Sequence, residues 1–223
     1  MNLGSMQWQL TMIWSILMNN RPDSYRLSFT TGGLFLQEAP VVAERFLALR
    51  DWKVTREQVR HENLLQVRTS SAATRISKEL ISRLELLATD ELECLLDGSQ
   101  RECGYVLWAA TCRRYAFIRD FAAEVLREHY LTLRMQMTLD DYDAFFNSKA
   151  VWHAELDELA LSTQRKLRQN LFRMLRDADL LSDQFLIQPA LLTPRLAKQF
   201  FVHDQDSMQV FPATDTDIQR WLQ

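Results

Sequence analysis

Hydrophobic side chains recur at helical spacing along most of the chain. Between residues 76 and 87, for example, apolar residues fall mainly three and four positions apart, which places them on one face of a helix. The same pattern predicts helices over residues 40–50, 55–66, 70–87, 89–97, 139–151 and 194–201. The longest periodic stretch runs from residue 100 to about 134. We expect a break near Asp120, because aspartate commonly caps a new helix. The fold class predicted is mostly α.

Polar residues at the expected helix starts support these boundaries. Ser99 with Glu102, and Thr55 with Gln58, have the spacing of a capping box. Thr138 is expected to cap the helix that follows it, with Asp140 and Asp141 in the first turn. Ser70 or Ser71 is the expected cap of the helix that begins there.

The chain is predicted to form two helical lobes after an N-terminal extension. The extension is residues 1–24; its first 20 residues carry no charge, and polar residues interrupt its apolar run. It lacks the basic start of a signal peptide and the length of a membrane span, so we expect neither. A helical bundle is predicted for residues 25–135 and a second lobe for residues 138–223.

The second lobe contains a pattern typical of a helix-turn-helix. A short helix is predicted for residues 154–160, a tight turn for 161–163 and a longer helix for 164–178. The aliphatic segment that follows contains Pro189 and favours a strand or hairpin, as in winged variants of this motif.

The longer helix has an apolar side and a basic side. At 100° per residue, Leu167, Leu171 and Met174 share one side. Five positive residues and no acidic one lie between residues 165 and 176. Arginine and glutamine can bond base edges through two donors or acceptors, and Ser or Thr at a helix start can bond phosphate. The predicted DNA-binding residues are Ser162, Thr163, Arg165, Lys166, Gln169, Arg173 and Arg176. Alternatively, this side is only solvated, or it pairs with the acidic residues 155–158.

A second phosphate site is predicted from arginines elsewhere. Arg68, Ser71 and Arg75 surround an expected helix start, where backbone N–H groups attract anions. Arg113 and Arg114 lie in the long periodic stretch and are predicted to have the same role. The alternatives are surface arginines beside a capped helix for the first group, and internal partners of carboxylates for the second.

Composition limits the function further. Lys and Arg total 26 against 29 Asp and Glu, a net charge of −3, which excludes a protein that coats nucleic acid by bulk charge. The positive residues are 21 Arg and 5 Lys, and arginine is the better ligand for phosphate and guanine. Three cysteines, with neither zinc nor disulfide spacing, indicate a reducing compartment.

No enzyme signature is present in the sequence. The four histidines are scattered, and no lysine of a phosphate-binding loop follows Gly32 and Gly33. We therefore predict no catalytic residue, no metal and no cofactor.

Three stretches, residues 25–40, 107–130 and 162–181, resemble the BrxA family of BREX phage-resistance systems. The run KLRQNLFRMLR within the third is the most specific part of the resemblance. It implies a cytoplasmic, all-helical, DNA-binding accessory protein, without a catalytic site or a membrane anchor, that works beside other BREX proteins.

A likeness to the helical antitermination factor NusB is also associated with that family, so RNA binding stays open. The predicted function is thus non-catalytic binding of double-stranded DNA in phage defence. The alternatives are a protein-interaction adaptor within the BREX complex and NusB-like RNA binding.

Overall fold

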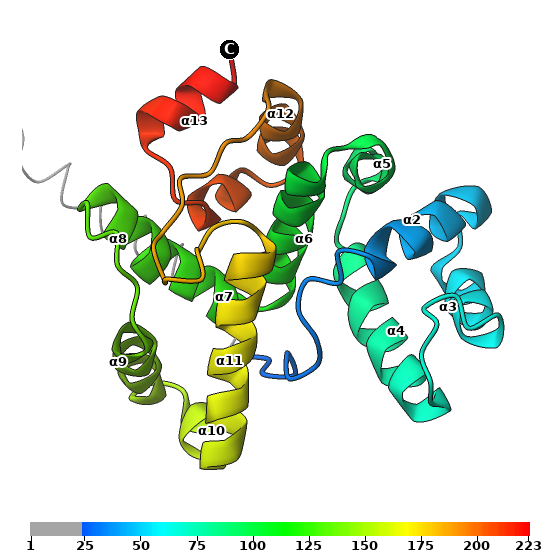
Figure 1. The fold of residues 1–223 in the computed structure, drawn as a ribbon, viewed down its shortest axis with the longest axis horizontal. Coiled ribbons are helices and arrows are strands. Elements are labelled where there is room, and N and C mark those ends of the chain that lie inside the picture. The colour runs from blue at the N-terminus through cyan, green and yellow to red at the C-terminus, as the bar shows by residue number, and fades with distance from the viewer. Residues whose placement is uncertain (1–23) are drawn as a thin grey trace, which may run out of the picture.

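The computed structural model describes residues 24–223, and this part of the chain is helical (Figure 1). In chain order its elements are α2 (Glu38–Leu49), α3 (Trp52–His61), α4 (Ser70–Leu84), α5 (Thr89–Asp97), α6 (Gln100–Arg114), α7 (Ala116–Phe121), the π-helix η1 (Ala122–Arg127), α8 (Glu128–Leu131), α9 (Leu139–Ala150), α10 (Ala154–Asp157), α11 (Leu161–Asp177), α12 (Pro194–His203), the 3-10 helix η2 (Gln205–Val210) and α13 (Asp215–Trp221). Within residues 24–223, β pairing is limited to isolated bridges. The mostly α class is confirmed for the described residues.

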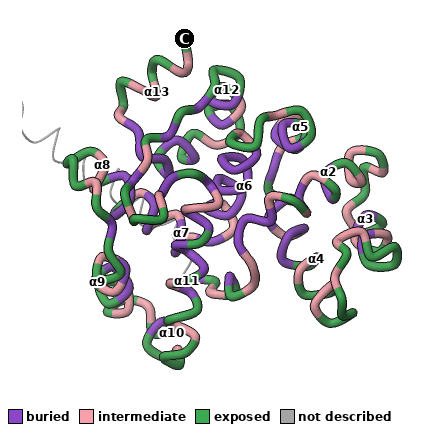
Figure 2. Tube along the Cα trace, viewed as in Figure 1, coloured by how far each residue is buried: buried purple, intermediate pink, exposed green. Residues whose placement is uncertain are grey.

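Helix α6 forms the centre of the molecule. Its residues from Cys103 to Cys112 are all buried, and Figure 2 shows the buried trace running through it. Helices α4 and α5 and the 3-10 helix η2 pack on it. Trp108 donates a hydrogen bond from its indole nitrogen to the carbonyl oxygen of Val210, 2.9 Å away. The C-terminal segment is therefore tied to the same centre as the N-terminal helices.

Two groups of helices flank the segment that precedes α2, residues 24–37, which we call the N-terminal loop. Helices α2, α3 and α4 lie on one side of it, and α9, α10 and α11 lie on the other (Figure 1). Helix α2 packs on α5 and α3, and α3 packs on α4. Helices α4 and α11 both begin at the lower edge of the view in Figure 1.

The long periodic stretch breaks at Tyr115, so the predicted break at Asp120 is wrong. Tyr115 is extended (φ −124°, ψ 96°) between α6 and α7. Its ring is fully buried, and its hydroxyl donates to Oε1 of Glu79 at 2.5 Å. Asp120 instead accepts a hydrogen bond from the Tyr25 hydroxyl at 2.7 Å. A tertiary contact thus sets the bend, and local sequence carries no sign of it.

Two predicted caps are confirmed and two are corrected. Ser99 and Thr138 cap α6 and α9 with complete capping boxes. Helix α3 begins earlier than predicted, because the carboxylate of Asp51 accepts from the backbone N–H groups of Lys53 and Val54. Thr55 lies inside the first turns, and its hydroxyl donates to the carbonyl of Asp51. Thr69, the residue before Ser70, caps α4.

A buried arginine joins the segments around the N-terminal loop. Arg83 of α4 is 1% exposed; it donates from Nε to Oε1 of Glu79 at 2.9 Å, and from Nη1 to the carbonyl oxygen of Gly33 at 2.9 Å. Its guanidinium also lies 5.1 Å from the centre of the Phe35 ring. Burial and the hydrogen bond to Glu79 together raise the pKa of Tyr115.

One hydrophobic core extends across the boundary predicted between the two lobes. Its buried residues run from Tyr25 to Phe211 and include Leu80, Phe121, Leu171 and Phe200. The division at residues 135–138 therefore does not separate two cores, and the division into lobes stays a prediction.

The predicted N-terminal extension lies outside the described residues, apart from Ser24. From residue 24 onward, the chain contains no helix with both the length and the apolar character needed to cross a bilayer.

A histidine and an aspartate meet where α8 approaches α9. Burial lowers the pKa of His129, Asp141 opposes that shift, and Arg134 adds to it. Burial acts to raise the pKa of Asp141. Hydrogen bonds from Thr138 and the charge interactions with His129 and Arg134 outweigh this effect and lower that pKa overall. Nε2 of His129 lies 3.8 Å from Oδ1 of Asp141. The neutral form of His129 is thus favoured by folding.

Replacing Arg83 by Met should destabilise the fold by about 3–5 kcal/mol, because Glu79 would keep a buried, uncompensated charge. Arg56→Met is the matched control, since Arg56 and Glu85 form a partly exposed ion pair that should contribute less than about 1 kcal/mol. Urea unfolding followed by circular dichroism measures both. Equal losses of stability in the two variants would contradict the central role of Arg83.

The stability of the protein should decrease as the pH falls below 6.5, the pKa of an unperturbed histidine, because the unfolded chain then binds a proton at His129 more readily than the folded chain does. In His129→Gln this part of the decrease should be absent. Urea unfolding between about pH 7 and pH 5 tests this. Identical pH dependence of the two proteins would show that His129 does not contribute.

Candidate nucleic-acid interface

Helix α11 begins at Leu161, three residues before the predicted start. The predicted turn at residues 161–163 is therefore wrong, and Ser162 and Thr163 lie in the first turn of the helix. Helix α10 is a single turn, joined to α11 by residues 158–160. Ala160 provides no side-chain cap, so the first N–H groups of α11 lack an internal side-chain acceptor.

The apolar side of α11 is buried as predicted. Leu167, Leu171 and Met174 are inaccessible to solvent. Asn170 lies beside them and donates from Nδ2 to the carbonyl oxygen of Phe29 at 2.9 Å. Near the end of the helix, a carboxylate oxygen of Asp177 accepts from the backbone N–H of Leu34 at 3.0 Å. Helix α11 is thus fixed to the N-terminal loop at two points.

The opposite side of α11 forms an exposed strip, which we call the α11 strip. It consists of five exposed residues, Ser162, Arg165, Lys166, Gln169 and Arg173. Within residues 24–223 neither Arg165 nor Lys166 forms an ion pair, and Lys166 contacts the amide oxygen of Gln169. Nε of Arg173 lies 3.8 Å from Asp177, but its side chain is 61% exposed. The strip therefore presents three cations and one amide to solvent.

Two predicted residues lie outside this strip. Thr163 is half-buried. Arg176 is 33% exposed; its guanidinium lies 5.8 Å from the centre of the Phe185 ring, and its Nε is 4.0 Å from Asp183. Arg176 thus turns toward the loop after α11. Arg173 is the more exposed of the two arginines.

The acidic residues of α10 do not neutralise the strip. Glu155 accepts a hydrogen bond from the backbone N–H of Tyr25 and lies 3.1 Å from Nδ1 of His153. Across the described chain, no ion pair joins α10 to α11. Asp143 of α9 pairs with Arg168, a cation that the sequence analysis did not single out. The alternative in which α11 pairs with residues 155–158 is therefore not supported.

The residues of the predicted second phosphate site lie in two separate places. Arg113 is an internal partner: both its terminal nitrogens lie 2.7 Å from the buried carboxylate of Glu91, and its Nε is 3.1 Å from Asp204. Ser71 and Arg75 lie in the first turns of α4, and Arg68 lies just before its cap; all three are exposed. Arg113 bonds the carbonyl of Leu86, beyond the other end of α4, a helix about 20 Å long.

Arg114 stays with Arg113 on α6, is half-buried, and has no carboxylate partner in the part of the chain that the structure describes. The arginines of α6 and those of α4 therefore do not form one site.

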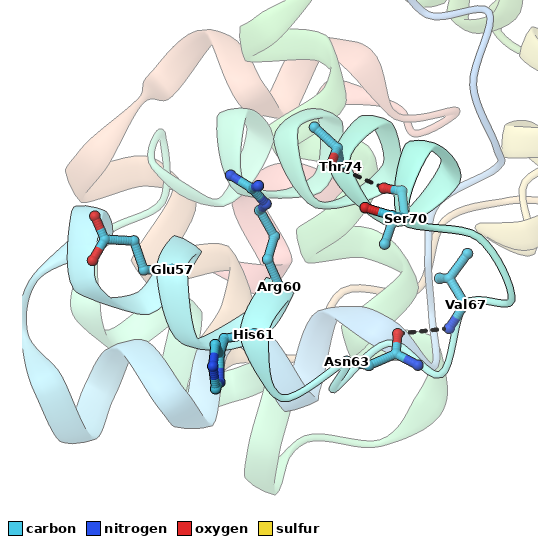
Figure 3. A pocket seen from close by; sticks show the side chains of 8 residues that line it. Glu57, Arg60, His61, Asn63, Val67, Ser70 and Thr74 are labelled. Carbon is cyan, nitrogen blue, oxygen red and sulfur yellow. Dashed lines mark hydrogen bonds between the residues drawn. The ribbon is translucent and has the colours of Figure 1, made fainter.

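A pocket of about 520 Å³ lies between α3 and α4 (Figure 3). Val67 and Thr74, which line it, are the sequence neighbours of Arg68 and Arg75. It is lined by Glu57, Arg60, His61, Asn63, Val67, Ser70, Ala73 and Thr74. In Figure 3, Arg60 extends beside α4, where Ser70 and Thr74 lie, and Glu57 projects away from them. The sequence analysis missed Arg60 and His61, because their place beside the start of α4 depends on how α3 packs on it.

Among the described residues, no cluster of three or more His, Cys, Asp or Glu side chains is arranged to hold a metal ion. Cys94, Cys103 and Cys112 are buried free thiols. Burial is the main cause that raises the pKa of Cys94, to about 12. These thiols are therefore protonated and inert, as expected for core residues.

The model of the BrxA family matches residues 23–203. The chain belongs to the BrxA family of BREX systems. The matched range includes the pocket between α3 and α4 and the whole of α11, and it ends at the last residue of α12. The resemblance noted in the sequence is therefore confirmed.

Two curated BrxA relatives agree with this assignment. The BREX protein BrxA of Escherichia coli O9:H4 (strain HS) is 27% identical over 147 residues, which are 66% of this chain and 69% of that protein. The BREX protein BrxA of Paramagnetospirillum magneticum (strain ATCC 700264 / AMB-1) is 25% identical over 163 residues, 71% of this chain and 80% of that protein.

A solved structure shares the fold of this BrxA family member. The crystal structure of an uncharacterized protein from Magnetospirillum magneticum superposes with a TM-score of 0.73 at 20% sequence identity. The alignment covers 83% of this chain and 97% of that one. The likeness extends over most of the helices described above.

Asn170→Ala should destabilise the protein by about 1–3 kcal/mol, because the buried carbonyl of Phe29 would lose its donor. Gln169→Ala, one residue away on the α11 strip, should change the stability by less than about 0.5 kcal/mol. Thermal and urea unfolding compare the two variants. Equal stability would show that the contact of α11 with the N-terminal loop contributes little.

Proposed function

We propose that the protein binds double-stranded DNA without catalysis, as an accessory of BREX phage defence, and that the α11 strip is the contact surface. The observation that carries this proposal is the strip itself: Arg165, Lys166 and Arg173 line one side of a helix whose other side is fixed in the core. Membership of the BrxA family supports a role in BREX defence together with other BREX proteins.

The side chains of the α11 strip can bind both the bases and the phosphates of DNA. A guanidinium can bond guanine or phosphate through two donors, and the amide of Gln169 matches the edge of adenine. Ser162 stands in the uncapped first turn of α11, where free N–H groups and the helix dipole favour a phosphate. We propose that Arg165 and Gln169 face the bases and that Lys166, Arg173 and Ser162 bind the backbone.

The neighbouring segments support a winged helix-turn-helix as the form of this interface. Helix α10, the link at 158–160 and α11 provide the two helices and the turn. After α11 the chain folds back on itself: Leu181 bridges Ile187, and the N–H of Ser182 donates to the carbonyl of Leu186 at 2.9 Å. We propose that this tight hairpin is the wing. A NusB-like arrangement stays a prediction, as does a cytoplasmic location.

Duplex DNA is favoured over duplex RNA by groove geometry. A helix that presents its side chains along one strip fits the wide major groove of B-form DNA, whereas the major groove of A-form RNA is too narrow and deep to admit it.

The adaptor function is favoured by a different surface, the turn between α9 and α10. Val151 and Trp152 are 72% and 84% exposed there, and Leu161 nearby in sequence is 69% exposed. Exposed tryptophans often anchor protein interfaces. In this second candidate function, the turn docks on another BREX protein. Trp152→Ala would then weaken assembly with that protein and leave DNA affinity unchanged.

The α11 strip is tested by replacing Arg165, Gln169 and Arg173 with Ala. Affinity for duplex DNA should decrease, and the plot of log affinity against log salt should flatten by about 0.9 for each phosphate that the variant no longer neutralises. Any recognition of bases should appear as a smaller difference in binding free energy between preferred and random duplexes, by roughly 1–3 kcal/mol for each bidentate pair. Fluorescence anisotropy at several salt concentrations measures both quantities.

The control variant replaces Arg101, Lys198 and Arg220 with Ala. These are exposed cations on α6, α12 and α13, and removing them changes the net charge by three, one more than the strip variant does. The control should retain its affinity. A folded strip variant that binds DNA as tightly as the control would contradict the proposed surface.

A further inference from the structure

The hairpin formed by α3 and α4, residues 52–84, carries cations without carboxylate partners. They are Lys53, Arg60, Arg68, Arg75 and Lys78, and none forms an ion pair with any residue in the range 24–223. The carboxylates nearby are already engaged: Glu62 pairs with Arg45, Glu85 with Arg56, and Glu79 with the buried Arg83. Glu57 is the remaining acid of the hairpin. The surface of the hairpin is therefore strongly positive although the whole chain is acidic.

Two of these cations, Arg75 and Lys78, lie along α4 together with the exposed Ser71. At 100° per residue, Ser71, Arg75 and Lys78 lie within 60° of one another around the helix, and they span about 10 Å along its axis. One DNA strand carries a phosphate about every 3.4 Å along the duplex axis, so a row of this length laid parallel to that axis spans about three phosphate steps. Arg68 precedes the cap at Thr69 and extends the row toward the turn.

The pocket between α3 and α4 continues this surface on the other side of α4. Arg60 contributes a guanidinium group to the lining of this pocket, His61 an imidazole ring and Ser70 a hydroxyl group. Asn63 uses its side-chain oxygen to hold the turn, by accepting from the N–H of Val67 at 3.1 Å. No Phe, Tyr or Trp is among the described residues that line the pocket, so nothing there can stack on a base. The groups that line the pocket can bind phosphate oxygens, but they do not distinguish one DNA base from another.

We propose that the α3–α4 hairpin binds the phosphate backbone of the duplex, as a second contact separate from the α11 strip. This inference rests on the proposed function, because it assigns the hairpin to the same duplex. The placement of the two surfaces supports it: α4 and α11 flank the N-terminal loop and begin at the same edge of the molecule (Figure 1). The hairpin adds affinity that does not depend on sequence, whereas the α11 strip distinguishes bases.

The test replaces Arg60, Arg68 and Arg75 with Ala in the full chain. The comparison proteins are the α11 strip variant and the control variant at Arg101, Lys198 and Arg220. Anisotropy titrations use a random duplex and a preferred duplex at four salt concentrations. The hairpin variant should bind both duplexes about tenfold more weakly at low salt. Its log–log salt slope should be flatter than that of the control by about 0.9 for each phosphate left without a cation.

His61 gives a local readout, because it lines the pocket and is not replaced in this variant. Its imidazole signals in a proton NMR spectrum are assigned by their absence from His61→Gln. Addition of a short duplex should move these signals in the unchanged protein and in the α11 strip variant, but not in the hairpin variant.

The outcomes separate the two proposals. If the hairpin variant keeps the slope of the control while the strip variant loses affinity, the hairpin contact is wrong and the α11 interface stands. If only the hairpin variant loses affinity, the hairpin contact stands and the α11 assignment is wrong. If polyglutamate moves the His61 signals and duplex DNA does not, the hairpin binds an acidic protein segment, and the inference is overturned.

Discussion

The position of one charged side chain governs how the helices around the N-terminal loop fit together. Arg83 is removed from water, so its charge has to be matched by groups that folding brings to it. Those groups come from three different segments: Glu79 one turn away on α4, the carbonyl of Gly33 in the N-terminal loop, and the ring of Tyr115 where α6 bends into α7. Moving any one of them would leave a buried charge poorly matched, and they therefore keep a single arrangement.

The same loop carries this constraint to α11. Phe29 and Leu34 bond Asn170 and Asp177, and Gly33 between them bonds Arg83. A side chain at Gly33 would collide with the carboxylate of Asp177, so the loop can approach α11 this closely only with glycine. The backbone under the α11 strip is thus held rigidly, while its long side chains remain free to adjust to a ligand. This is the arrangement that limits the entropy cost of binding.

The sequence predicted the part of the candidate interface that depends on the helical period. The buried Leu167, Leu171 and Met174 and the outward-facing Arg165 and Gln169 follow from the repeat of 3.6 residues alone. The helical period indicates only one buried side of α11. In the structure, α9 packs against another side of this helix. Phe172 is therefore buried and Arg168 is paired with Asp143, although both lie away from the apolar stripe.

Features set by distant contacts were not predictable in this way. Arg176 leaves the basic side because Phe185, beyond the end of the helix, attracts it. Arg113 and Arg75 look alike in sequence. Arg113, however, forms an ion pair with Glu91, whereas Arg75 forms no ion pair with any residue in the range 24–223. Whether an arginine is available to a ligand depends on where the carboxylates are, and that is a property of the folded chain.

The hydrogen bond between Asn170 and Phe29 joins residues 141 positions apart in the chain. As a consequence, α11 cannot be transferred to another protein by itself. Without residues 24–37, the side-chain amide of Asn170 would lack its acceptor and part of the apolar side of α11 would be exposed to water. A chain shortened to residues 138–223 would have the same defect. The α11 strip and the segment that orients it are physically one unit, although more than half of the chain lies between them in the order of synthesis.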